Sequence, residues 1–252
     1  MSWGSKRRNT IIILTFLIAL IPTIFIAYKI IYKKPTCFDG KQNGIETGID
    51  CGGACELVCN AETFDPIVLW TRLFEIAPGL YNTIAYIENP NIDAGIMNAK
   101  YTFRLFDEDN TLLYERNGRI DIQPKAIIPI IENGLFTNKL RAKRVTFDFT
   151  DDFVFEKKAP LEPVLIVKDE ELKEGNEPRV EAVLQNISIY PVKNIKTIVI
   201  LYDSKDNAIG SSSTIIDQIV GGASEPIVFT WPNSFDVPIS RLEIIPLYEN
   251  NF

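Results

Sequence analysis

The chain of 252 residues contains no histidine. Without an imidazole there is no Ser-His-Asp or Cys-His arrangement, no histidine general base and no histidine metal ligand. Cysteine is confined to one short window, and the rest of the chain has none: the four are Cys37, Cys51, Cys55 and Cys59. These absences exclude several common kinds of catalytic and metal site from the larger part of the protein.

Recognised catalytic motifs are also missing, since the sequence has no G-x-S-x-G, no P-loop and no Asp-Thr-Gly. A hydrolase that works without histidine would use paired carboxylates. Asp151 and Asp152 are adjacent, however, and neighbouring residues on a strand point to opposite faces. We therefore expect that the protein is not an enzyme and has no small-molecule substrate, and we keep the histidine-independent hydrolase as the second alternative hypothesis.

Charge is distributed unevenly along the chain. Of the 26 Lys and Arg residues, six lie before Pro35, whereas all 33 Asp and Glu residues follow it. The larger part is therefore strongly acidic, and such a surface repels nucleic acid and anionic headgroups. We expect no nucleic-acid partner.

A long uncharged run of mostly apolar residues covers residues 11–28 and contains one proline, Pro22, which lipid tolerates as a kink. A membrane-spanning helix needs about 20 residues, and the Lys29 stem can snorkel, so residues 11–32 are predicted to span a membrane. The alternative of a cleaved signal peptide would place Ala27 at −1 and the bulky Phe25 at −3 of the cleavage site, which is unfavourable. We expect an uncleaved single-pass anchor.

The basic residues on the two sides of this run do not decide its orientation, because three precede it and three follow it. The cysteines do, since disulfides persist outside the cytosol. We expect residues 1–10 to form a cytoplasmic tail and the remainder to lie outside the cytoplasm.

Residues 35–62 form a cysteine-rich segment with five glycines between Cys37 and Cys59 and few apolar residues. Such a segment cannot bury a core, so cross-links must replace one. Four cysteines allow three pairings, which the sequence leaves open. A zinc site is disfavoured because the spacings lack a C-x-x-C pair.

Oxygen-bearing side chains in the same segment suggest calcium as a possible cofactor. Asp39, Asn43, Glu46 and Asp50 are the candidate ligands, and the glycines between them would let the backbone wrap around an ion. The twelve-residue EF-hand pattern is absent, however, and Asp and Asn beside Gly also form ordinary turns. Both interpretations stay open at this point, and no other cofactor is expected.

The pattern C-x-D-G-x-x-N-G-x-E-x-G-x-D-C-G-G-x-C-x-x-x-C between Cys37 and Cys59 resembles a short motif of bacterial cell-surface and secreted proteins. There the motif sits beside β-sandwich modules. The resemblance implies an extracellular spacer or stalk and no activity.

The remaining residues alternate between apolar and polar side chains, as in residues 99–105 and 179–184, and this period of two predicts half-buried strands. The strands repeat at an offset of about 96 residues, with residues 103–113 matching 199–209. Asp107 and Asp203 occupy the same place in the two copies and are predicted to form the turn after a long strand. We predict two tandem β-sandwiches, residues 64–157 and 160–252, joined by a short hinge that contains Pro160 and Pro163.

The two copies resemble FxLYD-type modules of prokaryotic surface proteins, through Phe103, Leu105, Phe106 and Asp107 and through Val199, Leu201, Tyr202 and Asp203. The resemblance implies a seven-strand immunoglobulin-like fold in an extracytoplasmic setting and no catalytic residues. The first copy has Phe106 where the motif has Tyr, and the second has Val199 where it has Phe.

Together these features predict a mainly β protein: a transmembrane helix, a small disulfide-rich segment and two tandem immunoglobulin-like sandwiches. The favoured function is a non-enzymatic, membrane-anchored stalk, binding or envelope-assembly module with a protein partner at the cell surface. Exposed strand edges would dock that partner by β-augmentation. The first alternative is a calcium-dependent adhesion module that uses the cysteine-rich loop.

Overall fold

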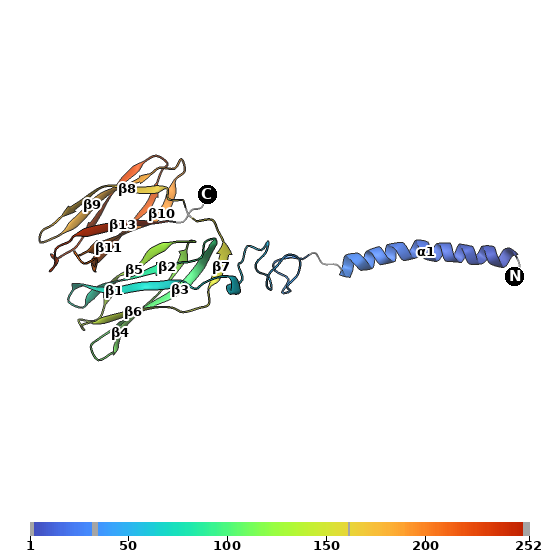
Figure 1. Ribbon diagram of the computed structural model, residues 1–252, viewed down its shortest axis with the longest axis horizontal. Coiled ribbons are helices and arrows are strands. Elements are labelled where there is room, and N and C mark those ends of the chain that lie inside the picture. Colours follow the sequence, from blue (N-terminus) through green and yellow to red (C-terminus); the bar gives the residue numbers. More distant parts are fainter. Residues whose placement is uncertain (1–2, 32–34, 161, 249–252) are drawn as a thin grey trace. The chain divides into compact units, whose positions relative to one another are not determined.

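The computed structural model describes residues 3–31, 35–160 and 162–248. The chain divides into two compact units, Met1–Glu56 and Leu57–Phe252. The first holds a helix and most of the cysteine-rich segment, and the second holds all the strands, as the ribbon in Figure 1 shows. The predicted fold class is confirmed: an apolar helix, a disulfide-bonded segment and two β-sandwich bodies.

Helix α1 (Trp3–Ile31) contains the predicted apolar run. Its window Ile11–Lys29 is long and apolar enough to cross a membrane, and none of that window is buried against protein. The hydroxyls of Thr15 and Thr23 donate to carbonyls one turn earlier, which hides two polar groups within the helix. The window Ile11–Lys29 therefore offers a predominantly apolar surface.

The cysteine-rich segment is held by two disulfides, Cys37–Cys55 and Cys51–Cys59, and no cysteine in the described chain is free. This result selects one of the three pairings that the sequence allowed. Gly53 has a φ of +56°, and a Cβ there would lie 1.6 Å from the carbonyl oxygen of Ile45. Only glycine fits this position, so the segment is shaped by backbone geometry as well as by its cross-links.

Replacing Cys37 and Cys55 by serine tests how much the cross-link matters. A bridge that closes a loop of this length contributes about 3 kcal/mol. We expect the segment 35–56 of the variant to become sensitive to limited proteolysis while the melting temperature of the strand unit stays unchanged. A variant whose segment resists protease as well as the wild type does would show that the turns hold this fold without the bridge.

The first sandwich consists of two sheets. One has the order β1-β2-β5, and the other has the order β4-β3-β6 with β7 also paired to β3. The strands are β1 (Ile67–Ala77), β2 (Leu80–Glu88), β3 (Ala94–Phe106), β4 (Leu112–Ile122), β5 (Ile127–Phe136), β6 (Arg144–Phe149) and β7 (Val154–Lys157).

The second sandwich repeats this topology with the sheets β12-β9-β8 and β11-β10-β13. Its strands are β8 (Leu165–Lys173), β9 (Arg179–Asn186), β10 (Val192–Tyr202), β11 (Ala208–Ile219), β12 (Ser224–Thr230) and β13 (Arg241–Leu247). The central strands correspond as β2 to β9 and β3 to β10, so the structure contains the duplication seen in the sequence. The seven strands implied by the resemblance are present in the first copy only when β7 is counted, and the described residues of the second copy form six.

Each sandwich has its own apolar core. In the second, Val199 and Leu201 of β10 pack with Leu184 of β9, and all three are fully buried. In the first, Phe103 of β3 packs with Phe147 of β6, their ring centroids 4.9 Å apart. These inward rows alternate with outward ones, as the sequence pattern predicts.

Three edge strands carry a proline: Pro129 in β5, Pro226 in β12 and Pro246 in β13. Pro129 and Pro226 lie at equivalent places in the two copies. Because proline has no N–H to donate, an added strand loses a hydrogen bond at each of these edges. Docking by β-augmentation is therefore disfavoured at β5, β12 and β13.

Candidate functional site

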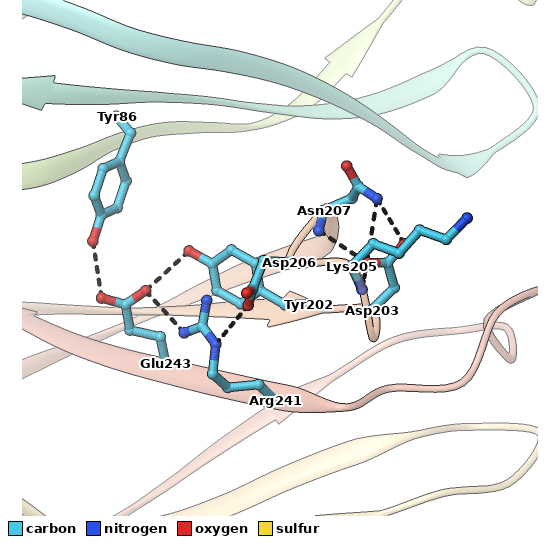
Figure 2. Close-up of polar contacts among 8 residues, drawn as sticks. All are labelled: Tyr86, Tyr202, Asp203, Lys205, Asp206, Asn207, Arg241 and Glu243. Atoms are coloured by element: carbon cyan, nitrogen blue, oxygen red, sulfur yellow. Dashed lines mark hydrogen bonds and ion pairs between the residues drawn. The ribbon is translucent and has the colours of Figure 1, made fainter.

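The turns after β3 and β10 are nearly identical. The Asp107 Oδ1 atom accepts from the amides of Asp109 at 3.0 Å and Thr111 at 2.7 Å, and Asp203 Oδ1 accepts from Lys205 at 2.8 Å and Asn207 at 2.9 Å. The Asn207 side chain adds a hydrogen bond that lowers the pKa of Asp203. Figure 2 shows the second turn. Both carboxylates serve the backbone of their own turn.

The four candidate calcium ligands belong to one hydrogen-bonded network in the cysteine-rich segment. Asp50 accepts from the amides of Asp39 and Gly40, both at 2.9 Å. Asp39 accepts from the Asn43 side chain at 2.9 Å, which lowers the pKa of its carboxyl, and Glu46 accepts from the Asn43 amide at 2.9 Å. The structure thus brings the four together, with their carboxylates directed at N–H donors.

Calcium binding by this segment stays a prediction with a direct test. Calcium would have to compete with the amide donors for the carboxylates of Asp39 and Asp50, so a site here is expected to be weak, in the millimolar range of extracellular modules. Calorimetric titration of the full chain with calcium chloride measures it, with Asp50→Asn as the matched variant. Absence of heat at millimolar calcium, or equal heat from wild type and Asp50→Asn, would remove the calcium hypothesis.

Asp151 and Asp152, considered for a hydrolase, lie in the loop between β6 and β7 and not on a strand, as the sequence argument assumed. Asp151 forms an ion pair with Lys100 at the surface, and this contact lowers its pKa. An acid with a lowered pKa is unsuited to donate a proton at neutral pH. Asp151 is therefore unsuited to act as a general acid.

The most extensive feature that sequence reasoning missed is an apolar contact between the two sandwiches. The outward face of the sheet β1-β2-β5 packs on the outward face of β11-β10-β13, so that the strand unit has four stacked layers (Figure 1). Ile84 of β2, Ile131 of β5 and Ile198 and Ile200 of β10 form its centre, each at most 1% exposed. We call this contact the inter-sandwich interface.

Comparison of the two copies shows why the outward face of the sheet β11-β10-β13 is apolar. Outward positions of β3 hold Thr102 and Arg104, whereas the corresponding positions of β10 hold Ile198 and Ile200. Arg104 pairs with Glu115 and Asp148 at the surface. The duplicated strands thus differ at the residues that decide whether the outer face meets water or protein.

The other pair of central strands, β2 and β9, also differs at an outward position, but here the apolar residue is in the first copy. Ile84 of β2 corresponds to Glu181 of β9, whose carboxylate pairs with Arg179 at 2.8 Å and with Lys173 on an exposed face. Each copy therefore has one polar outer face and one apolar outer face. The two apolar outer faces are those that meet.

A polar cluster closes one side of the inter-sandwich interface (Figure 2). Tyr86 of the first sandwich donates to Glu243 of the second at 2.9 Å, and Tyr202 donates to the same carboxylate at 2.9 Å. The guanidinium of Arg241 stacks on the Tyr202 ring at 3.7 Å and also contacts Glu243 and Asp206. Trp70 stacks on Tyr86 with ring centroids 5.1 Å apart.

Burial and the hydrogen bond to Glu243 raise the pKa of Tyr86 well above its usual range, and the same causes raise the pKa of Tyr202 to about 12. The folded state therefore favours the neutral phenols. Their contribution to stability is complete below the ordinary tyrosine pKa of about 10 and declines as the pH rises through the folded-state values.

Further hydrogen bonds cross the interface outside this cluster. Asn82 donates to the Ser211 carbonyl at 3.3 Å, Asn133 to the Ser213 hydroxyl at 2.8 Å, and Asn233 to the Ile76 carbonyl at 3.1 Å. Lys196 donates to the Ile131 carbonyl at 3.1 Å. The polar rim around an apolar centre is the anatomy of a specific interface.

Alkaline titration tests the polar cluster. We expect the melting temperature to fall between about pH 10 and pH 12, because ionised Tyr86 and Tyr202 would face the Glu243 carboxylate. A double variant, Tyr86→Phe with Tyr202→Phe, keeps the ring packing and should show a shallower decline over this range. An equally steep decline in the double variant would assign the alkaline sensitivity to other tyrosines, such as Tyr101, whose pKa is also raised by burial.

No family model matches the chain, and no curated protein matches it. Distant similarities to solved β-sandwich structures exist. A red sea bream transglutaminase is 11% identical with a TM-score of 0.23, over 72% of this chain and 31% of that one. The CBM22-1–CBM22-2 tandem domain of Paenibacillus barcinonensis Xyn10C is 8% identical with a TM-score of 0.17, over 73% of this chain and 85% of that one. The chain thus spans less than a third of the transglutaminase.

Proposed function

We propose that the protein is a non-enzymatic, single-pass membrane protein that presents its two sandwiches outside the cytoplasm as one rigid binding or assembly module. Helix α1 is the anchor, and residues 1–10 are its cytoplasmic tail. The disulfides support the extracytoplasmic assignment, because such bonds persist in oxidising compartments. The FxLYD-like motif supports a surface setting.

The observation that carries this proposal is the inter-sandwich interface. Two sandwiches joined by a free hinge would sample many orientations, whereas an apolar contact with a hydrogen-bonded rim holds them in one. A rigid block can present residues from both copies to one partner at a fixed spacing. The cysteine-rich segment, stiffened by its cross-links, suits the role of a spacer between anchor and block.

The docking surface of this module is assigned to strand edges that lack proline. β1 is such an edge, and its first residues, Ile67, Val68 and Leu69, are 49%, 38% and 44% exposed. Apolar side chains on an unpaired edge suit the addition of an extended partner segment. Val68→Lys and Leu69→Lys would place charges on this edge and block such pairing.

Three measurements on whole cells test the proposal. Protease added outside should digest residues beyond the anchor but leave an N-terminal tag intact, and alkaline carbonate should fail to extract the chain. In vivo crosslinking should capture a protein partner with the full chain and lose it after deletion of residues 64–252 or with the β1 edge variants. An externally accessible N-terminal tag, extraction by carbonate, or capture that survives the deletion would overturn the assignment.

A further inference from the structure

A cavity of about 680 Å³ lies within the strand unit, where the two sandwiches and their linker meet. The loop before β5 and the strand β5 form one wall, β10 and β13 form the other, and Pro160 and Pro163 of the linker close one end. This volume lies within the range of about 300–1,000 Å³ that is typical of small-ligand sites. We call it the linker groove.

The walls of the linker groove are apolar and poor in backbone donors. Five prolines line it: Pro124, Pro129, Pro160, Pro163 and Pro246, together with isoleucines of the first sandwich such as Ile120 and Ile128. Pro129 and Pro246 lie on the two edge strands that flank the groove, and neither edge can offer a complete ladder to an added strand. The groove is therefore built for an apolar body and not for β-augmentation.

The charged residues of the linker groove are mostly basic: Arg119, Lys125 and Lys196 against Asp121 alone. The Asp121 carboxylate already accepts the Asn98 amide at 2.6 Å. Beyond Pro35 the chain has an excess of acidic residues, so a cationic groove is contrary to its overall charge. The local charge favours an anionic occupant.

Lys196 is the basic residue that the fold places most deeply, and the duplication supplies its internal comparison. The corresponding lysine of the first copy, Lys100, pairs with Asp151. The registers of β3 with β6 and of β10 with β13 place Tyr248 where the first copy has Asp151. In the second copy, therefore, the lysine has been retained and its carboxylate partner replaced.

Among the residues that the structure describes, no other neighbour supplies a counter-ion to Lys196. Its Nζ atom donates to the Ile131 carbonyl at 3.1 Å, and within residues 3–31, 35–160 and 162–248 it forms no ion pair with a carboxylate. The closest acid that influences it, Glu132, accepts from Tyr101 at 2.8 Å and faces Arg116 at 3.6 Å. The Tyr248 hydroxyl already accepts a hydrogen bond from the Val164 amide at 2.9 Å. Burial lowers the pKa of Lys196, which reflects the cost of this unpaired ammonium.

We propose that the linker groove binds a small amphipathic carboxylate, whose apolar body lies along the prolines and isoleucines and whose carboxylate pairs with Lys196. Arg119 and Lys125 at the rim contribute to the attraction. The ligand is held and not converted, so the site goes beyond the proposed function without depending on it. It also adds a small-molecule ligand to a protein for which the sequence predicted no small-molecule substrate.

The probe is decanoate labelled with ¹³C at the carboxyl, titrated into the full chain in phosphatidylcholine nanodiscs, with empty nanodiscs as background. The carboxyl chemical shift should report saturable binding. Lys196→Met should weaken binding at least tenfold, whereas Lys100→Met, the matched change in the first copy, should alter it less than twofold. Decanol, which lacks the charge, should bind at least tenfold more weakly than decanoate.

A second variant separates loss of the site from loss of the fold. Tyr248→Asp restores the carboxylate partner of the first copy and should suppress decanoate binding while Lys196 is still present. Each variant loses one hydrogen bond, that from Lys196 to the Ile131 carbonyl or that from the Val164 amide to Tyr248, so each should melt below the wild type but still in a cooperative transition that shows it is folded. Equal decanoate binding by wild type and Lys196→Met, equal binding of decanol and decanoate, or equal losses in Lys196→Met and Lys100→Met would each overturn the proposal.

Discussion

Replacing Ile198 by threonine and Ile200 by arginine is expected to separate the two sandwiches while leaving each one folded. These are the residues that the first copy carries at the same positions: Thr102, which is buried and hydrogen-bonded to Asn117, and Arg104, which is partly exposed. Both isoleucines are 0% exposed and point away from the core of their own sandwich. Burying an unpaired guanidinium costs about 3 kcal/mol or more, so the interface should open to hydrate it.

Opening has three measurable consequences. The radius of gyration from small-angle scattering should increase, the linker around residues 158–164 should become sensitive to protease, and thermal unfolding should split into two transitions. The matched control is Arg104→Ile, the reciprocal of Ile200→Arg, at a partly exposed position on the outer face of β3. It removes surface ion pairs worth at most about 1 kcal/mol and should leave a single transition. A single unshifted transition in Ile198→Thr/Ile200→Arg would show that the interface does not couple the sandwiches.

Asn186→Asp is expected to destabilise the second sandwich by about 3 kcal/mol. The side chain is 0% exposed, and its Nδ2 atom donates to the carbonyls of Tyr190 at 2.8 Å and Ile219 at 3.0 Å. Its Oδ1 atom accepts from the Ser188 amide at 2.9 Å and hydroxyl at 2.8 Å. A carboxylate would lose both donors and face two carbonyl oxygens without water, which carries the full desolvation penalty. Chemical denaturation of the full chain measures the loss.

Ser188→Ala is the control for this prediction. It removes the sequon Asn186-Ile-Ser188. Of the hydrogen bonds described above it removes only that of the Ser188 hydroxyl, so the free energy of unfolding should fall by about 1 kcal/mol. Asn89→Asp supplies a second test, because Asn89 makes the equivalent contacts in the first sandwich, to the carbonyls of Ala94 and Gln123. Equal stability of Asn186→Asp and wild type would contradict the structural role. Because Asn186 is buried, the folded chain cannot carry a glycan on it.

The sequence was sufficient to predict the duplication and the class of each element. Alternation between apolar and polar residues can be recognised in residues 99–105 and 179–184, because one face of each of these strands is polar. The repeat at an offset of about 96 residues can be recognised from residues 103–113 and 199–209. The helix follows from length and apolarity alone. The pairing of the four cysteines could not be predicted, because their spacing along the chain does not determine which thiols approach one another.

The sequence does contain an indication of the inter-sandwich interface, although alternation between apolar and polar residues does not reveal it. Residues 198–202 of β10 are apolar without interruption, and a strand of this kind is covered on both faces. A difference between the copies, such as Arg104 against Ile200, points to the same conclusion. Alternation within one strand identifies its own core, whereas only the comparison between copies reveals that an outer face is also buried. Pro160 and Pro163, in the segment predicted to act as a hinge, line a groove beside that contact.

The reciprocal change of outer faces has a consequence for how this protein can be divided or recombined. A sandwich cut out at the linker would carry a bare apolar sheet, centred on Ile84 in one copy and on Ile198 and Ile200 in the other. Such surfaces drive association with unintended partners. The two sandwiches therefore form one unit and are not exchangeable repeats, and either one would need polar residues on its apolar outer face before it could be used alone.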